Sequence, residues 1–286
     1  MQKLYGRRGP LQQIITSRNV TGDYLTRSGA PGGYTAKYAE GWVWQSSMPG
    51  TVPLDIYWHF GRGDHWAVAT SGSRTAAENA GYVFRSRAGY IYAAPQPGTN
   101  ALRRYRSPNR LENITTASAA AEQEVLAAGY TFIGDEGYIF RASDVPFDTL
   151  TYYWSTARND SLLTRTGSQL AQDAENEGYF NRGLDGITLK HNVEQTTALR
   201  QFWNTGRSDH FAAATTQGIN AAFTDGYREL PREGYVFTTS QNDTQGLRLY
   251  WNPLTVDNFT TAENLSDAIL GYQFVRNEGF VPPALW

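Results

Sequence analysis

The sequence of 286 residues contains no cysteine, which excludes disulfide bonds, thiolate metal sites and cysteine nucleophiles. Lysine is scarce, with 3 residues against 22 arginines, and the formal net charge is only -2. Proteins that bind nucleic acids carry concentrated positive charge, so we expect no nucleic-acid partner. No window approaches the ~18 consecutive apolar residues of a membrane span, so we expect no insertion into a membrane.

A targeting signal is also missing from the first residues. Lys3, Arg7 and Arg8 are not followed by an apolar stretch, so we expect no secretory leader. Without a leader or cysteine, we expect a cytoplasmic location, or release from the cell without a classical leader.

Aromatic residues and glycine are abundant instead. Aromatic residues make up 14% of the chain, and there are 28 glycines. This composition favours short strands joined by tight turns. With 40% hydrophobic and 18% charged residues, the chain is expected to be globular rather than disordered.

A repeat with six units runs through the chain. A Gly-Tyr pair recurs at intervals of 45 to 49 residues, and a second glycine follows each first one by eight residues. The first glycines are Gly33, Gly81, Gly129, Gly178, Gly226 and Gly271, and the second are Gly41, Gly89, Gly137, Gly186, Gly234 and Gly279. Such regularity identifies repeated structural units.

Each unit also carries a recurring acid, which is Asp23, Asp64, Glu112, Asp160, Asp209 or Asp257. The stretch between this acid and Gly-Tyr predicts a short helix, as at residues 118–128, which ends at a glycine in the left-handed conformation. The residues after Gly-Tyr predict two strands around a turn. One unit is therefore expected to read strand, strand, helix, strand, strand.

A longer period of three units lies above the short one. GRGDHW at 61–66 recurs as GRSDHF at 206–211, and ENITTA at 112–117 as DNFTTA at 257–262, both after 145 residues. We therefore predict an all-β chain with short helices, made of two tandem β-trefoil-like domains of three four-stranded units each, over residues 1–145 and 146–286. The alternative is a single six-unit ring or a six-bladed β-propeller.

The order of aromatic pair, Gly/Asn turn, Asp-His-aromatic, helix, Gly-Tyr and acid-Gly resembles a repeat module of unassigned function. That module is attached to many secreted bacterial and fungal hydrolases and also occurs alone. Its full front motif is present at residues 64–66 and 209–211, whereas Asn113, Ser161 and Asn258 replace the histidine elsewhere. A cysteine-free, internally threefold chain also resembles the cytoplasmic β-trefoil lectins of mushrooms, and this resemblance implies carbohydrate binding.

Carbohydrate recognition needs an aromatic face for the C–H side of the ring and fixed polar groups for its hydroxyls. The middle unit of each block gathers these residue types, and the third unit offers a weaker version. The predicted carbohydrate-binding residues are Trp58, Arg62, Asp64, His65, Trp66 and Asn113, with Trp203, Arg207, Asp209, His210, Phe211 and Asn258 in the second domain. Strand alternation separates positions 64 and 66 from 65. We predict no catalytic residue, metal or other cofactor, because the usual motifs are missing.

Structural roles compete with these assignments. The recurring acid is expected to accept backbone amides at a turn or cap. The tryptophans Trp58, Trp154, Trp203 and Trp251 recur at positions suited to core packing. His65 and His210 occur in only two of six units, so the repeat does not require them, and both roles stay open for them.

We therefore predict a multivalent, non-catalytic lectin that binds glycans or glycoproteins and agglutinates cells, either as a monomer or as a homo-oligomer. If His65 and His210 touch the sugar, affinity should weaken as they become charged near pH 6. The alternative is a protein-binding module such as a protease inhibitor, which would use the proline-bearing loop at 93–100. Displacement by free sugars distinguishes a lectin from an inhibitor.

Overall fold

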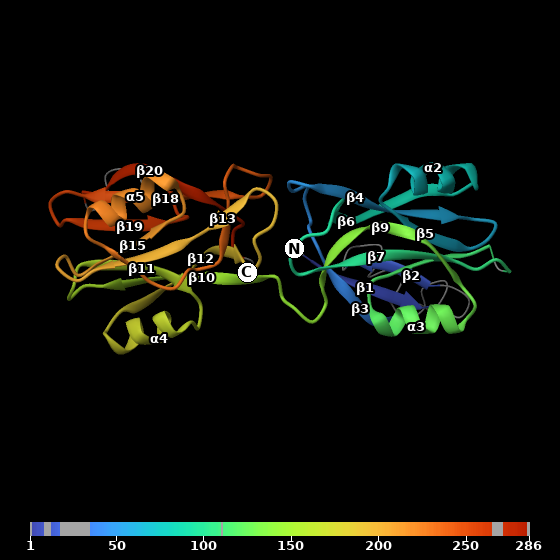
Figure 1. The fold of residues 1–286 in the computed structure, drawn as a ribbon, viewed down its shortest axis with the longest axis horizontal. Coiled ribbons are helices and arrows are strands. Elements are labelled where there is room, and N and C mark those ends of the chain that lie inside the picture. The colour runs from blue at the N-terminus through green and yellow to red at the C-terminus, as the bar shows by residue number, and fades with distance from the viewer. Residues whose placement is uncertain (1, 9–12, 18–34, 110, 265–270, 285–286) are drawn as a thin grey trace. The chain divides into compact units, whose positions relative to one another are not determined.

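The computed structural model describes residues 2–8, 13–17, 35–109, 111–264 and 271–284. They belong to two compact units, Met1–Pro146 and Phe147–Trp286, referred to below as the first and second domains. In Figure 1 the colours run from blue to green in the first domain and on to red in the second. Within the described residues, every helix is too short or too polar to cross a membrane.

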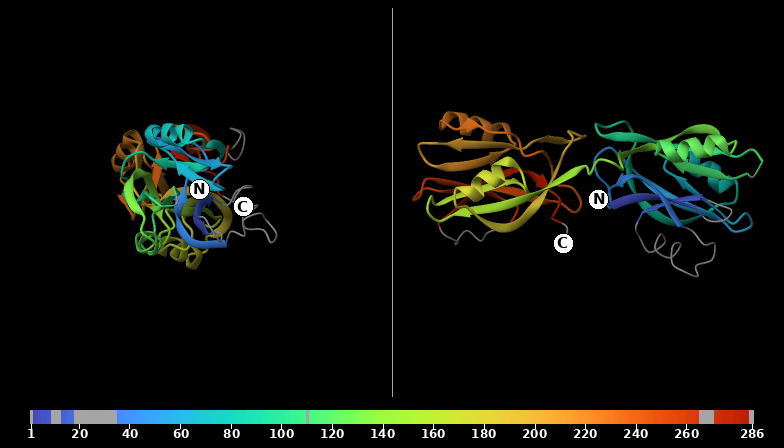
Figure 2. Two further views of the ribbon diagram at one scale, coloured as in Figure 1. Left: turned by 90° about the vertical axis from the view of Figure 1, so that its right-hand side faces the viewer. Right: turned by 90° about the horizontal axis from the view of Figure 1, so that it is seen from below.

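The first domain is one antiparallel sheet built from three-stranded units (Figures 1 and 2). The first strand of each unit is central, giving the orders β2-β1-β3, β5-β4-β6 and β8-β7-β9. The elements are β1 (Gln2–Arg8), β2 (Gln13–Ser17), β3 (Thr35–Val43), β4 (Thr51–His59), β5 (Asp64–Val68), α2 (Ser71–Asn79), β6 (Val83–Tyr92), β7 (Thr99–Arg106), β8 (Asn113–Thr116), α3 (Ala119–Ala127) and β9 (Thr131–Arg141).

The second domain repeats this plan with an interruption in its middle unit. Its elements are β10 (Phe147–Ser155), β11 (Asp160–Arg165), α4 (Gln169–Asn176), β12 (Phe180–Leu189), β13 (Thr196–Ala198), β14 (Arg200–Asn204), β15 (Asp209–Ala213), α5 (Thr216–Thr224), β16 (Arg228–Glu229), β17 (Tyr235–Phe237), β18 (Gln245–Asn252), β19 (Asp257–Thr261) and β20 (Gln273–Val281). Pro231 lies in the gap between β16 and β17, and its missing N–H cannot donate to a ladder. Strands β14, β15 and β16 consequently form a small separate sheet.

The third strand of a unit is longer than predicted. The sequence predicts two strands around a turn after Gly-Tyr, but β6 and β9 continue past Gly89 and Gly137. The register with the neighbouring strand shifts at these glycines, which marks a β-bulge. The prediction of four strands per unit is therefore wrong: the bulge bends one strand where a turn was expected, which leaves three strands in each unit except the interrupted middle unit of the second domain.

The bulge glycines mark where neighbouring units touch. A Cβ atom on Gly41 would lie 2.2 Å from the carbonyl oxygen of Phe140, in the third unit. One on Gly89 would lie 2.7 Å from that of Trp44, in the first unit, and one on Gly137 would lie 2.6 Å from a carbonyl oxygen of the second. The second domain repeats this ring at Gly186, Gly234 and Gly279. Each domain thus closes on itself after three units, so the alternative of one six-unit ring or propeller is wrong.

The acid before the bulge glycine joins the units as well. Glu136 accepts hydrogen bonds from the backbone amides of Ala69 and Thr70, at 2.8 and 3.1 Å, and from the hydroxyl of Ser73 at 2.6 Å. These donors belong to the start of α2 in the preceding unit. Backbone amides at the corresponding places in other units donate to Glu40, Asp185, Glu233 and Glu278. Satisfied in this way, the buried carboxyl groups tie each helix to a neighbouring unit.

All three units contribute to one apolar core in each domain. In the first domain the core contains Val43, Leu54, Ile91, Leu102 and Ile139, among others. In the second it contains Leu150, Leu163, Leu199, Val236, Leu247 and Val281, among others. The described part of the chain is therefore mostly β, with four short helices and three antiparallel sheets that do not close into a barrel. The β-trefoil plan itself stays a prediction.

Candidate ligand-binding site

The histidines of the front motif stack on tryptophans of the opposite strand. Trp203 on β14 faces His210 on β15, with ring centroids 4.3 Å apart and ring planes tilted by 41°. Trp58 and His65 form the same pair between β4 and β5, at 4.2 Å. All four recurring tryptophans (Trp58, Trp154, Trp203 and Trp251) are half-buried. Their side chains therefore lie at the surface of the units and not in the central core, contrary to the core-packing interpretation.

His210 is fixed by a carboxyl group of the preceding unit. Asp160 Oδ1 accepts its backbone amide at 2.8 Å, and Asp160 Oδ2 lies 2.6 Å from its Nδ1. The hydroxyl of Tyr179 donates to the same Oδ2. Nδ1 of His210 is thus engaged by Asp160, and Nε2 is the ring nitrogen left for other partners.

A cleft of about 320 Å³ opens between the first and second units of this domain. Trp203 and His210 line it from the second unit, and Tyr179 lines it from the first. The other lining residues are Arg158, Leu162, Gln169, Leu170, Asp173, Ala174, Glu177, Arg228, Leu230 and Pro231. Because the third strand is interrupted at Pro231, Leu230 and Pro231 also line the cleft. The volume lies within the usual range of small-molecule sites.

Polar groups of the cleft hold one another in place. Arg158 Nη1 lies 2.9 Å from a carboxylate oxygen of Glu177, and the guanidinium carbon lies 5.7 Å from the centre of the Tyr179 ring. The amide of Gln169 donates to Asp173 at 2.8 Å. The cleft therefore presents oriented donors and acceptors together with an indole ring.

A smaller cleft of about 200 Å³ repeats this geometry between the second and third units. Tyr227, Trp251 and Asn258 occupy the places of Tyr179, Trp203 and His210, and Phe211 also lines it. Arg207 pairs with Asp225 at 3.1 Å and lies over the Tyr227 and Trp251 rings, at 5.7 and 5.9 Å. This pairing matches that of Arg158 with Glu177 in the larger cleft.

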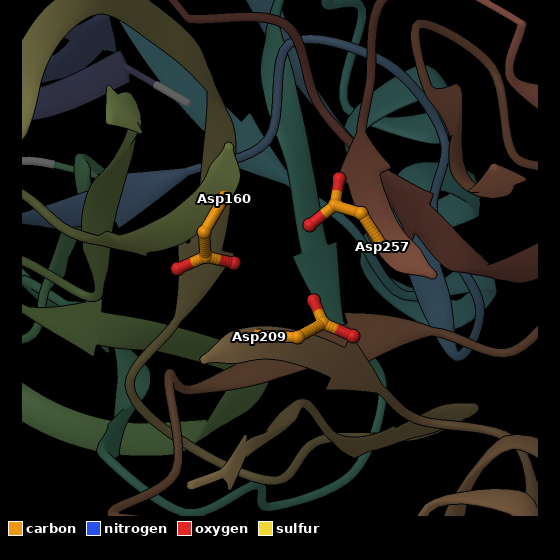
Figure 3. Close-up of side chains that lie close together, drawn as sticks. All are labelled: Asp160, Asp209 and Asp257. Carbon is orange, nitrogen blue, oxygen red and sulfur yellow. The ribbon is translucent and has the colours of Figure 1, made fainter. Parts of the chain in front are cut away.

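The three recurring acids of the second domain lie together in its interior (Figure 3). Asp160, Asp209 and Asp257 each offer an oxygen atom within 4.8 Å of the other two. Each also accepts a hydrogen bond from the Gly-Tyr tyrosine of its own unit. Burial first, and then neighbouring carboxylates, raises the pKa of Asp209 and Asp257 above the ordinary value. Asp160 and Asp209 thus accept backbone amides as predicted, but these amides belong to the following unit and not to a turn or helix cap beside the acid.

In the first domain, burial places most of the predicted residues in the interior. Asp64 accepts the hydroxyl of Tyr82, and burial raises its pKa to about 7. Burial lowers the pKa of His65 to about 4, so the expected charging of His65 near pH 6 is wrong. Trp66 packs in the core against Tyr82, with ring centroids 5.5 Å apart, and Arg62 is exposed, 5.8 Å over the Tyr82 ring. Asn113 is buried at the start of β8, and Asp23 lies outside the described residues.

The structure divides the predicted residues of the second domain between two clefts. Trp203 and His210 line the larger one, whereas Phe211 and Asn258 line the smaller. Asp209 is buried beside them. The reason is strand alternation, because consecutive residues of β15 point to opposite faces of the hairpin.

Sequence reasoning missed the contribution of the neighbouring unit. Gln169, Asp173 and Glu177 lie on or next to α4, and their spacing of four residues places them along one helix face. The sequence alone could therefore have indicated this polar helix face. Nothing in the period of the repeat shows that this face lines a cleft with the tryptophan of the following unit.

Comparison with known proteins gives a family for both domains. A family model described as a domain of unknown function, DUF5648, matches residues 27–143 and 150–281. The chain belongs to the DUF5648 family. No curated protein and no solved structure matches the chain. The two DUF5648 matches follow the two three-unit blocks, so both clefts lie within the second DUF5648 domain.

Proposed function

We propose that this tandem DUF5648 protein is a non-catalytic, multivalent carbohydrate-binding protein, and that its principal site is the cleft at Trp203. The observation that carries the proposal is a half-buried indole beside fixed polar groups in a cleft of about 320 Å³. A sugar ring has an apolar C–H face and a rim of hydroxyls, and this pairing of surfaces complements both.

The polar groups suit recognition. Glu177 is paired with Arg158 and Asp173 with Gln169, so each carboxylate is oriented by a neighbour and still has lone pairs for hydroxyl donors. His210 adds a further polar atom at Nε2. Glycan ligands would thus be held by several charge-assisted hydrogen bonds around one stacking contact.

Repetition of the site supports multivalency. The smaller cleft presents Trp251 and Asn258 in the same arrangement, and the first domain repeats the Trp58–His65 pair. Linking weak sites makes later contacts intramolecular and raises avidity by roughly 10² or more. The ring of three units also supports a β-trefoil-like plan as the fold of each domain.

A glycan array followed by calorimetry with the best ligand tests the proposal. Trp203→Ala should weaken binding about tenfold, because an aromatic contact contributes about 1 kcal/mol beyond area burial. Trp154→Ala is the matched control, since it removes the equivalent tryptophan of the first unit, which lines neither cleft. Thermal unfolding checks that both variants stay folded.

Two results would overturn the proposal. A blank array with folded protein would rule out glycans and favour the protease-inhibitor alternative, to be assayed through the loop at 93–100. Equal losses of affinity in the two variants would show that the cleft at Trp203 is not the site.

A further inference from the structure

Two independent observations coincide in the interior of the second domain. The first is the cluster itself, which Figure 3 shows: Asp160, Asp209 and Asp257 come from three different units. One oxygen atom of each lies within 4.8 Å of one oxygen atom of the other two. The second is a buried acceptor atom that lacks a hydrogen-bond donor. Asp257 is only 2% exposed, and no hydrogen-bond donor from the described residues reaches its buried Oδ1. A buried polar atom that lacks a partner needs a physical explanation, and a role in binding a ligand would provide that explanation.

The sequence of the repeat explains why this oxygen atom of Asp257 lacks a donor. The residue after each acid donates to the acid of the preceding unit. His210 donates to Asp160 from its backbone amide and aligns its Nδ1, and Asn258 donates to Asp209 from its backbone and side-chain amides at 3.2 and 3.0 Å. Continuing the ring, the donor for Asp257 should be Ser161.

Ser161 does not fill this role. Its hydroxyl donates to the backbone carbonyl of Asn258, at 3.0 Å. Asp257 therefore accepts the hydroxyl of Tyr272 on Oδ2, and its other close side-chain partner among the described residues is the acidic carboxyl group of Asp209. The short serine stands where the other two units of this domain have a histidine and an asparagine, so the ring lacks one donor at this point.

The charge of the cluster is also incompletely balanced. Within the described part of the chain, no lysine or arginine pairs with the three carboxyl groups, and His210 Nδ1 lies 2.6 Å from Asp160. Buried carboxylates this close repel one another, and a bound cation would offset the repulsion. Carboxylate oxygen is the ligand that hard divalent cations prefer.

We propose that Asp160, Asp209 and Asp257 bind a divalent cation of the oxygen-preferring class, namely Ca²⁺, Mg²⁺ or Mn²⁺. An ion with oxygens at 2.0–2.6 Å brings its ligand atoms to roughly 3–4.5 Å from one another, which the cluster permits. His210 and Asn258 would orient the ligands from outside, as second partners of metal-bound carboxylates do. The site adjoins both clefts through His210 and Asn258, but it is argued from the three carboxyl groups alone, so this proposal does not depend on the proposed function.

The experiment uses the full chain after chelation and dialysis at pH 7.5. Mn²⁺ binding is measured by electron paramagnetic resonance, Ca²⁺ and Mg²⁺ binding by calorimetry, and thermal unfolding is recorded with and without each ion. We expect one strong site and a higher melting temperature with the preferred ion.

Two variants target the site from different sides. Asp257→Asn removes one ligand charge, and Ser161→Asn places an amide donor on the Asp257 oxygen atom that the ion would otherwise bind. Each change should weaken binding about tenfold or more. Asp243→Asn is the control, because it removes an exposed acid of the same domain at a left-handed turn position that asparagine tolerates, and it should bind like the parent chain.

The proposal is overturned if the folded parent chain binds none of the three ions up to millimolar concentration. It is also overturned if folded Asp257→Asn and Ser161→Asn bind the ion as tightly as the parent chain, because the ion would then lie elsewhere. Ser161→Asn keeps all three carboxylates, so it tests the site even where Asp257→Asn fails to fold.

Discussion

Single buried acids connect the units of this protein. Asp185 shows the pattern: its carboxylate accepts the hydroxyl of Thr261 at 2.9 Å and the amide of Ala262 at 3.0 Å, both from another unit. Burial raises the pKa of Asp185 to about 7, and the two hydrogen bonds only partly offset this effect. The neutral acid is therefore the form that the folded domain prefers below that pH.

The raised pKa predicts a stability that falls with rising pH. The ordinary pKa of aspartate is about 3.9, so above about pH 4 the unfolded chain has lost the proton that the folded chain keeps until about pH 7. The contribution of Asp185 is complete below pH 4 and is lost as the pH rises through 7. Between pH 5 and pH 8 the parent chain should lose about 2 kcal/mol more unfolding free energy than Asp185→Asn.

Urea unfolding of the second domain at several pH values measures this difference. The control Asp243→Asn, at an exposed position, should follow the parent chain. Parallel pH curves for the parent chain and Asp185→Asn would show that Asp185 is not the group responsible.

The bulged third strand is the element that holds the three units together. In β9 the backbone at Gly137 has φ of 150°, and an added Cβ would lie 2.6 Å from the carbonyl oxygen of Tyr92. The close approach involves backbone on both sides, so a rotamer change cannot relieve it. The bulge glycine therefore sets how near neighbouring units come.

We expect Gly137→Ala to destabilise the first domain by about 2–4 kcal/mol, because the methyl group collides with backbone and the conformation disfavours a side chain. Gly134→Ala in the same strand is the control, since no atom lies within 4 Å of its added Cβ. That change should be neutral or slightly stabilising. Calorimetric melting of the full chain records both effects, and equal melting temperatures for the two variants would contradict the argument.

On the scale of the whole molecule, each domain has its own core and its own closed ring of three units. The first compact unit ends at Pro146 and the second begins at Phe147. The bulge glycines make their close approaches inside their own domain: Gly41 meets the third unit of the first domain, and Gly186 meets the third unit of the second. Each half should therefore fold without the other.

Fragments 1–146 and 147–286 should each give a cooperative melting transition. Fragment 147–286 should keep the affinity of the intact chain for a monovalent sugar, while binding to a glycan-coated surface should fall about tenfold or more. Mixing the two fragments should not restore surface binding, because the gain comes from the covalent link. Loss of folded structure in either fragment would contradict the independence of the domains.

The sequence by itself determined the number of units, their grouping in threes and the positions of the glycines and acids. These features recur at a fixed interval, because each unit places the same requirement on the backbone and so needs the same residue type at the same position. The expectation that the acid accepts amides was also sound, because a carboxylate inside a protein needs donors. The turn predicted at Gly89 failed because a bulge and a turn call for the same glycine.

Only the tertiary structure decided which residues meet. The cleft combines Trp203 with Glu177 of the preceding unit, and Asp160 takes its donors from His210 of the following one. Contacts between units depend on how the three units close into a ring. The spacing of residues within one unit does not show which residues of other units become neighbours. For the same reason the missing donor at Ser161 becomes visible only when Asp257 is seen beside Asp160 and Asp209.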